Sequence, residues 1–263
     1  MELGLKDKVV VVSAGSRGLG RASAMALARE GARVAIFSRD RGNLDIAAEA
    51  ILTDTGIEIL TGVADVIDHD GVDAFIDDVE SRLGPPQILI VNAGGPPPGS
   101  FLDLTEKDWS AAFELTLMSA VHLCHRVIPS MTGLGWGRIL HLTSISVKQP
   151  LPNMILSNSL RAAVTGLAKS LADELGPSNI TVNCICTGLT MTERLMELAR
   201  ARLEQEGASM DDTMASWLTQ IPSGRLGTVE EFGSLVAFLC SEQAGYINGA
   251  SIPFDGGMYR GLL

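Results

Sequence analysis

The chain has 263 residues, which is long enough for one large α/β domain with a substantial buried core. Acidic residues number 31 and basic residues 20, so the formal net charge is -11, which argues against nucleic acid and anionic membranes as partners, because both are bound by clustered lysine and arginine. The sequence has no apolar run of about 18 residues and no signal-peptide pattern. We expect no membrane-spanning helix and a cytoplasmic location.

Four cysteines are present, and Cys184 and Cys186 are the only close pair. In a strand both would point to the same face, and no second pair completes a zinc site. His122 and His125 stand at helical spacing without a third ligand, so we interpret them as packing or surface residues. We therefore expect buried thiols and no metal.

The N-terminal region predicts a strand, a tight turn and a helix. Residues 9–12 are four valines, residues 13–20 read Ser-Ala-Gly-Ser-Arg-Gly-Leu-Gly, and residues 21–30 show helical spacing before a second strand at 34–37. Backbone N–H groups at such a helix N-terminus bind a nucleotide pyrophosphate. The turn residues expected to contact a dinucleotide are Gly15, Ser16, Arg17, Gly18, Leu19 and Gly20.

The rest of the chain alternates between the two kinds of element. Further strands are predicted at 57–63, 88–91, 137–142, 180–185 and 252–254, and helices at 44–52, 72–83, 108–131, 155–175 and 229–240. This alternation is typical of a parallel sheet with helices on both faces. We predict a single-domain Rossmann fold over residues 1–263, with a doubly wound sheet of about seven strands.

One stretch, at about residues 190–221, interrupts the alternation with helical, charged sequence. It contains Met191, Met196, Met210 and Met214, and methionine suits an adaptable apolar surface. A helical insertion directly after a strand is either a lid or substrate-side wall, or a plain packing excursion. Both interpretations stay open.

Several motifs occur in order along nearly the whole chain: the glycine turn, Asn92-Ala93-Gly94, Ser144, residues 157–161 and residues 187–192. Together with Gly-Arg-Leu-Gly at 224–227 and Asp-Gly-Gly at 255–257, they resemble the short-chain dehydrogenase/reductase family, above all its 3-oxoacyl-acyl-carrier-protein reductase branch. The resemblance implies a nicotinamide cofactor, a small-molecule substrate and a homotetramer or homodimer.

The chain also departs from the family pattern. Ser13-Ala14 stands in place of Thr-Gly, Thr116 in place of an asparagine that supports a proton-relay water, and Thr187 in place of proline. The largest departures are at the Tyr-x-x-x-Lys motif, where Ser157 replaces the tyrosine and Arg161 the lysine. Serine is a far weaker acid than a phenol, and a guanidinium stays protonated.

The resemblance implies that Ser144 polarises the substrate carbonyl and that Arg161 holds the nicotinamide ribose. Ser157 is then a poor proton donor. A relocated acid is one hypothesis: Lys148, with its pKa lowered by burial against Pro150 and Pro152, would protonate the alkoxide. The alternative is a solvated loop lysine. We interpret His141 as a packed neutral ring, and we set Tyr246 and Tyr259 aside as too distant in sequence.

Cofactor choice rests on the end of the second strand. The strand ends Phe37-Ser38-Arg39, with no acidic residue at the place where an aspartate would accept the adenosine ribose hydroxyls. Ser38 and Arg39, with Arg17, would instead bind a 2′-phosphate. We expect NADP(H) rather than NAD(H). Asp65 matches a family residue that contacts the adenine, with helix capping as the alternative. Other cofactor contacts implied by the resemblance are Asn92, Ala93, Gly94, Arg161, Gly188, Thr190 and Thr192.

These residues predict an NADP(H)-dependent oxidoreductase that transfers a hydride between nicotinamide and a ketone or 3-oxoacyl thioester. The catalytic residues of this hypothesis are Ser144, Ser157, Arg161 and Lys148. The alternative is a catalytically weak or inactive dinucleotide-binding paralogue that acts through its assembly or a partner. The cofactor motifs fit both.

Overall fold

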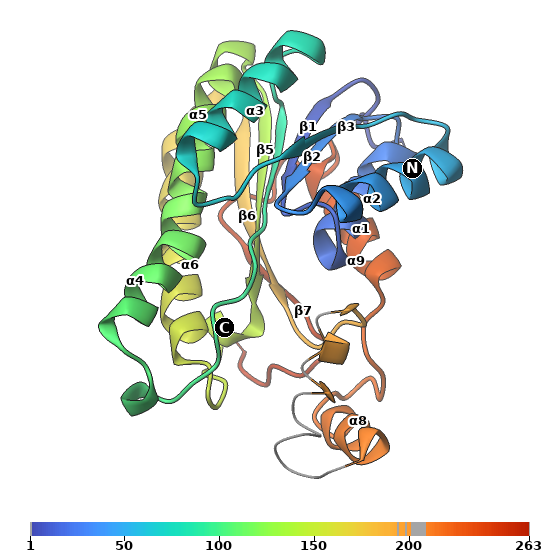
Figure 1. Cartoon of the computed structure of the whole chain (residues 1–263). Helices are drawn as coiled ribbons and strands as arrows, with labels where there is room; N and C mark the ends of the chain where they lie inside the picture. Colours follow the sequence, from blue (N-terminus) through green and yellow to red (C-terminus); the bar gives the residue numbers. More distant parts are fainter. Residues whose placement is uncertain (1, 194, 198, 201–208, 263) are drawn as a thin grey trace.

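A seven-stranded parallel sheet runs through the middle of the molecule (Figure 1). The computed structural model describes residues 2–193, 195–197, 199–200 and 209–262. The strand order is β3-β2-β1-β4-β5-β6-β7, as the predicted Rossmann fold requires. The strands are β1 (Val9–Ser13), β2 (Arg33–Ser38), β3 (Leu60–Val63), β4 (Ile88–Val91), β5 (Gly137–Ser144), β6 (Ile180–Thr187) and β7 (Ser251–Phe254).

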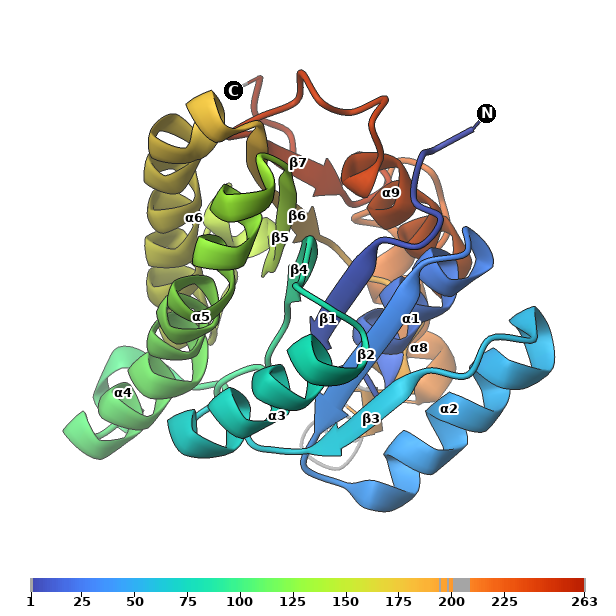
Figure 2. The same cartoon turned by 90° about the horizontal axis from the view of Figure 1, so that it is seen from above.

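Helices cover both faces of this sheet (Figure 2). On one side lie α1 (Gly18–Arg29), α2 (Arg41–Thr55) and α9 (Val229–Cys240). On the other lie α3 (His69–Arg82), α4 (Glu106–Phe113), α5 (Ser119–Leu134) and α6 (Ile155–Leu175). Among the described residues, no helix is both long and apolar enough to cross a membrane.

Each face of the sheet carries its own hydrophobic core, which is why the strands are apolar along their whole length. Val10 and Val12 of β1 belong to the core under α1 and α9, whereas Val9 and Val11 belong to the core under α3, α5 and α6. All five residues of β1 are buried. The valine run therefore forms a central strand, as the sequence predicts.

The helix predicted at 108–131 differs from the structure. It begins at Glu106, because Thr105 and Asp108 form a capping box, and it is interrupted by a π-helical segment at Glu114–Met118 before α5. A π turn holds one more residue than an α turn, so it shifts the helix faces on either side. The apolar spacing alone did not reveal this shift.

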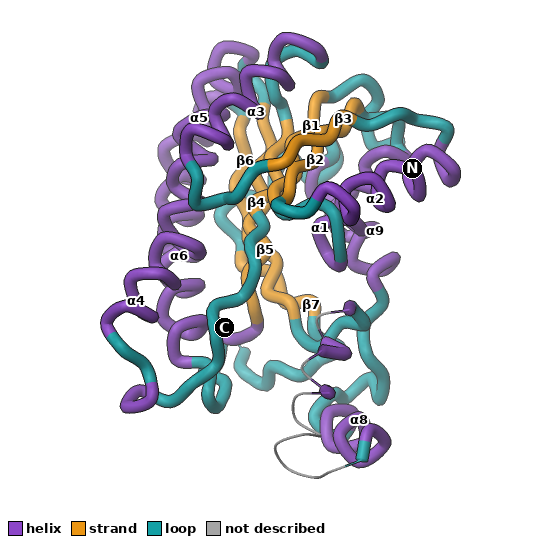
Figure 3. Tube along the Cα trace, in the orientation of Figure 1, coloured by secondary structure: helices purple, strands orange, loops and turns teal. Residues whose placement is uncertain are grey.

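The insertion predicted at 190–221 contains α8 (Met210–Leu218). Figure 3 shows α8 beyond the sheet, near the end of β7. Leu195, Ile221 and Leu226 form a small buried cluster there, and Met214 packs against it. Residues 194, 198 and 201–208 of the insertion lie outside the described part of the chain.

The carboxyl ends of the strands all meet one edge of the sheet, where ligands bind in such folds. The strand order reverses between β1 and β4, which places the switch point of the fold at this edge. Two loops are joined beside it, because Gly99 N donates a 2.8 Å hydrogen bond to Asn153 O. The loop after β4 and the loop before α6 therefore border one space.

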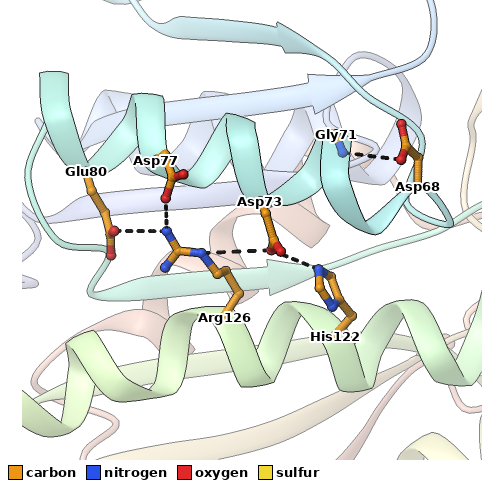
Figure 4. A network of polar contacts seen from close by, with 7 residues as sticks. All are labelled: Asp68, Gly71, Asp73, Asp77, Glu80, His122 and Arg126. Atoms are coloured by element: carbon orange, nitrogen blue, oxygen red, sulfur yellow. Dashed lines mark hydrogen bonds and ion pairs between the residues drawn. The ribbon is translucent and has the colours of Figure 1, made fainter.

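On the outer side of the helical layer, charged residues join α3 to α5 (Figure 4). Arg126 bonds to Asp77 and lies 3.1 Å from a Glu80 carboxylate oxygen, and His122 Nε2 lies 2.9 Å from Asp73 Oδ1. His122 is thus a packing and surface residue, as the sequence analysis expects.

Candidate active site

The glycine turn between β1 and α1 has no room for a side chain at Gly20. A Cβ on Gly20 would lie 2.3 Å from Ala14 O and 2.9 Å from the side-chain amide of Asn92. Gly18, the first residue of α1, has a positive φ of 52°. Ala14 also has a positive φ, 47°, so the alanine that replaces the family glycine keeps the left-handed conformation despite its steric cost. The turn thus keeps a shape that brings backbone close to a ligand.

Hydrogen bonds tie this turn to the end of β4. Ser13 Oγ donates to Asn92 O at 2.7 Å and accepts from Asn92 N at 2.8 Å, and Asn92 Nδ2 donates to Ala14 O at 3.2 Å. The serine at the start of the turn therefore has a direct structural role. Ala93 and Gly94 follow Asn92 at the same edge, as predicted.

Two arginines of the turn and α1 contact the insertion. Arg17 lies 3.2 Å from a carboxylate oxygen of Glu197, and Arg21 lies 3.1 Å from one of Glu193. Sequence reasoning missed both glutamates, because no spacing links residues about 175 positions apart. The insertion thus lies over the glycine turn, with Thr192 Cβ 3.7 Å from a Cβ built on Gly18.

At the end of β2, Arg39 lies 3.6 Å from Asp65 Oδ2, and its side chain is 78% exposed. Asp65 accepts a hydrogen bond from Ile67 N, whereas Asp68 is the residue that caps α3. The capping alternative for Asp65 is therefore wrong. Ser38 and Arg39 both lie at the exposed carboxyl end of the strand, where its chain turns toward α2.

The loop after β6 carries the remaining predicted cofactor contacts. Gly188 N donates to Phe254 O at 2.8 Å, and a Cβ on Gly188 would lie 2.7 Å from Asp255 Cβ. Thr190 is 5% exposed and its hydroxyl has no hydrogen-bond partner. Thr192 Oγ1 accepts from Leu195 N at 3.2 Å. These residues lie in the loop that leads from the end of β6 into the insertion.

Ser144, Ser157 and Arg161 come from β5 and α6. Ser144 is the last residue of β5, and its Oγ accepts from Ser146 N at 3.1 Å. Ser157 is only 3% exposed. Arg161 Nη1 donates a 2.8 Å hydrogen bond to Leu142 O, two residues before Ser144. Burial lowers the pKa of the Arg161 guanidinium, which still carries its charge at neutral pH.

Lys148 follows this group and has an unexpected neighbour. It ends the short 3-10 helix Ile145–Val147 and is half-buried. Its Nζ lies 6.0 Å from the ring centroid of Tyr259, which the C-terminal segment brings to this side of the sheet. Tyr259 N is held by a 2.7 Å hydrogen bond to Asp255 Oδ2. Distance along the chain was therefore a poor reason to set Tyr259 aside.

Comparison with known proteins agrees with this geometry. Residues 13–259 match a family model described as enoyl-(acyl carrier protein) reductase. The 3-oxoacyl-[acyl-carrier-protein] reductase FabG of Pseudomonas aeruginosa is 32% identical over 98% of this chain and 99% of its own length. The chain belongs to the short-chain dehydrogenase/reductase family. The expected family and fold are thereby confirmed.

Solved structures of this family are close neighbours. The L-sorbose reductase of Gluconobacter frateurii, in complex with NADPH and L-sorbose, superposes with a TM-score of 0.95 at 33% identity, covering 100% of both chains. A short-chain oxidoreductase of P. aeruginosa, described as containing an atypical catalytic center, has a TM-score of 0.90 at 32% identity and covers 98% of this chain and 99% of its own. This chain is an oxidoreductase of the short-chain dehydrogenase/reductase type.

Proposed function

We propose that this short-chain dehydrogenase/reductase transfers a hydride between NADP(H) and a carbonyl or hydroxyl substrate, with an unusual set of catalytic residues. The proposal rests on the residues that meet at one edge of the sheet. The glycine turn, the Ser144 hydroxyl and the Arg161 guanidinium come from three different elements and lie at the same strand ends. Such an arrangement serves a dinucleotide and a substrate side by side.

The tight packing at Gly20 and the positive φ of Gly18 support a dinucleotide at the glycine turn, because both positions favour a residue without a side chain and so leave the backbone open to a ligand. The N–H groups of the first turn of α1 would bind the pyrophosphate. Asn92, Gly94 and the loop after β6 would line the rest of the cofactor, which supplies the hydride acceptor or donor. Asp65 would face the adenine.

We further propose a preference for NADP(H) that rests on Ser38, Arg39 and Arg17. The Arg39 side chain is exposed, and its ion pair with Asp65 is long, at 3.6 Å. Its guanidinium can therefore also bind a 2′-phosphate. Replacing Arg39→Ala should weaken NADPH binding roughly tenfold and leave NADH binding unchanged, measured by nicotinamide fluorescence. Arg41→Ala, a neighbouring exposed arginine, is the control. Equal loss for both cofactors would contradict the assignment.

In the proposed reaction, Ser144 Oγ donates a hydrogen bond to the substrate carbonyl oxygen, and the positive charge of Arg161 stabilises the oxygen as it becomes negative. Ser157 stands where the family has its tyrosine, and its burial supports the view that it does not supply the proton. Arg161 stands where the family has its lysine. Its remaining N–H groups would hold the ribose hydroxyls.

Lys148 is our candidate for the proton source. In the reducing direction its ammonium gives a proton to the alkoxide oxygen and takes one back from solvent. Lys148→Ala should lower kcat roughly 10²-fold, whereas Lys169→Ala on the same side of the sheet should leave it unchanged. Tyr259→Phe removes the phenol hydroxyl and keeps the ring. A lower kcat in this variant would show that the hydroxyl takes part in the reaction. Full activity of Lys148→Ala would contradict this role.

Two relatives support particular parts of the proposal. The similar L-sorbose reductase is described with a sugar ketone and NADPH, and the similar P. aeruginosa oxidoreductase with an atypical catalytic center. The first favours a ketone substrate. The second is a structural neighbour of this chain whose catalytic center is described as atypical.

The alternative is a dinucleotide-binding paralogue with little or no turnover, and the buried Ser157 is the observation that favours it. The test is NADPH oxidation against small ketones, aldehydes and 3-oxoacyl thioesters, beside the double variant Ser157→Tyr, Arg161→Lys. Turnover by the unmodified protein supports the enzyme. No turnover by the unmodified protein, together with turnover by the double variant, supports the paralogue. Its assembly, proposed as a homotetramer or homodimer, is measured by light scattering.

A further inference from the structure

The insertion carries two carboxylates that face the glycine turn. Glu197 Oε1 lies 3.2 Å from Arg17 Nη2. Glu193 Oε1 lies 3.1 Å from Arg21 Nη2. The two arginines are four residues apart at the start of α1, and the two glutamates are four residues apart in helical sequence, so each pair lies on one face of its segment. Two similar ion pairs therefore join the insertion to the turn.

Arg17 lies on the side of the turn where the 2′-phosphate is proposed to bind. It is the N-cap residue of α1, with an extended backbone (φ -142°, ψ 164°). Gly15 N donates a 3.1 Å hydrogen bond to Phe37 O, which joins the turn to the end of β2. Ser38 and Arg39 follow directly in the chain. The Arg17 guanidinium therefore starts from a backbone position beside the proposed 2′-phosphate site.

Glu193 faces a different part of the cofactor site. Its Oε2 lies 4.0 Å from a Cβ built on Gly18, the first residue of α1. The N–H groups at this helix N-terminus would bind the pyrophosphate. NADPH and NADH share the pyrophosphate, whereas only NADPH has the 2′-phosphate. The two glutamates thus stand beside chemically different parts of the dinucleotide.

The ion pair between Arg17 and Glu197 is of a kind that a phosphate can replace. The two side chains are 47% and 46% exposed, so the pair is weak and a displaced carboxylate can turn into water. Hydrogen bonds from a guanidinium to a phosphate are charge-assisted and stronger than neutral ones. The carboxylate must still leave the arginine before the phosphate takes its place, and this exchange reduces the gain in binding.

We propose that Glu197 limits the preference for NADP(H), because its carboxylate competes with the 2′-phosphate for Arg17. Glu197 is then a specificity-determining residue that comes from the insertion and not from the end of β2. NADH leaves the ion pair intact, whereas NADPH exchanges it. The inference rests on the proposed function, which places Arg17 at the 2′-phosphate.

Titration of NADPH and NADH, followed by nicotinamide fluorescence, tests the competition. We expect Glu197→Gln to tighten NADPH binding roughly fivefold and to leave NADH binding unchanged, because glutamine keeps the size of the side chain and removes its charge. Glu193→Gln is the matched control, since it removes the neighbouring ion pair of the same segment. It should change both affinities by the same factor. An unchanged ratio of the two affinities in Glu197→Gln, or the same rise in Glu193→Gln, would overturn the proposal.

A second variant separates competition from direct repulsion. In an Arg17→Ala background, Glu197→Gln should have no further effect on NADPH binding, because the guanidinium for which the two anions compete is gone. A fivefold gain that persists in this background would overturn the proposal in favour of direct repulsion between Glu197 and the phosphate.

Adenosine 2′,5′-bisphosphate and adenosine 5′-monophosphate give a readout without nicotinamide or turnover. Calorimetry should show that Glu197→Gln tightens binding of the bisphosphate alone, and that the gain shrinks as salt is added, because salt screens an exposed pair. Equal effects on both nucleotides would overturn the proposal. If neither dinucleotide binds to the unmodified protein or to Glu197→Gln, the proposed function fails and the inference with it. If both bind and their ratio is unchanged in the variant, the inference alone fails.

Discussion

Two arginines lie against opposite ends of β5, the fully buried Arg138 within the strand and the half-buried Arg161 of α6, and their N–H donors are bound to very different extents. At the amino end, Arg138 donates to the backbone oxygens of Ser241, Gly137 and Asn179 and stacks 4.3 Å from the Trp136 ring. At the carboxyl end, the described part of the chain gives Arg161 one acceptor, Leu142 O. A buried cation with most of its N–H donors bound to backbone oxygens stabilises a fold. One with donors left over is available to a ligand, so we assign structure to Arg138 and function to Arg161.

The largest effect is expected at Arg161. Replacing Arg161→Met should lower kcat roughly 10²- to 10³-fold, because the charge at the reacting oxygen is lost. Stability should change little or rise, since an apolar side chain replaces a poorly compensated buried charge. Initial rates of NADPH oxidation and thermal unfolding measure the two quantities. A large loss of stability with normal kcat would reverse the assignment.

Arg138→Met is the opposite case. It should lower the free energy of unfolding by about 3 kcal/mol, because the carbonyl oxygens of Ser241, Gly137 and Asn179 each lose a donor, the first two of them in buried hydrogen bonds. The kcat of the folded fraction should remain that of the unmodified protein. Urea unfolding, followed by rates at a temperature where the variant is folded, checks both. A variant as stable as the unmodified protein would show that the carbonyls find other donors.

His141, in the carboxyl half of β5, makes the free energy of unfolding depend on pH. Its pKa in the folded protein is lowered to about 4, below its ordinary 6.5, so the unfolded chain takes up this proton first. The stabilisation is therefore complete above pH ~6.5 and is lost as pH falls toward ~4, by about 3 kcal/mol. Urea unfolding of His141→Leu should show a shallower decline over this range than the unmodified protein, whereas His125→Leu, an exposed histidine, should not.

The smallest effect is expected at a surface arginine. Arg126 faces Asp73, Asp77 and Glu80 across α3 and α5, and its side chain is 23% exposed. Arg126→Ala should cost about 1 kcal/mol of unfolding free energy, and less at high salt, because water screens exposed pairs. Chemical unfolding at two salt concentrations measures it. A loss of kcat would show that charge on this outer face reaches the site.

The sequence predicts the strands well because they are short apolar runs, rich in β-branched residues in β1, β4 and β6. Residues that end a strand, such as Asn92 and Ser144, are thereby placed at one edge. The partners of those residues follow from packing instead. The contact between the Leu142 oxygen and Arg161 depends on how α6 lies against β5, and so does the small cavity lined by His141 and Arg161. Glu193, Glu197 and Tyr259 reach the site from segments that are distant in sequence. Hydrophobic periodicity predicts local structure and cannot predict contacts between distant segments.

The π-helical segment at Glu114–Met118 makes one continuous helix serve two purposes. Before it, Ala112 and Trp109 pack with Leu156 and Leu160 of α6, and after it Leu123 and Val127 pack into the sheet core. Removing one residue there would rotate the preceding part by roughly 100° about the helix axis while leaving the core side unchanged. The direction of α4 can therefore be changed in evolution by a single deletion or insertion, independently of the residues that keep the sheet folded.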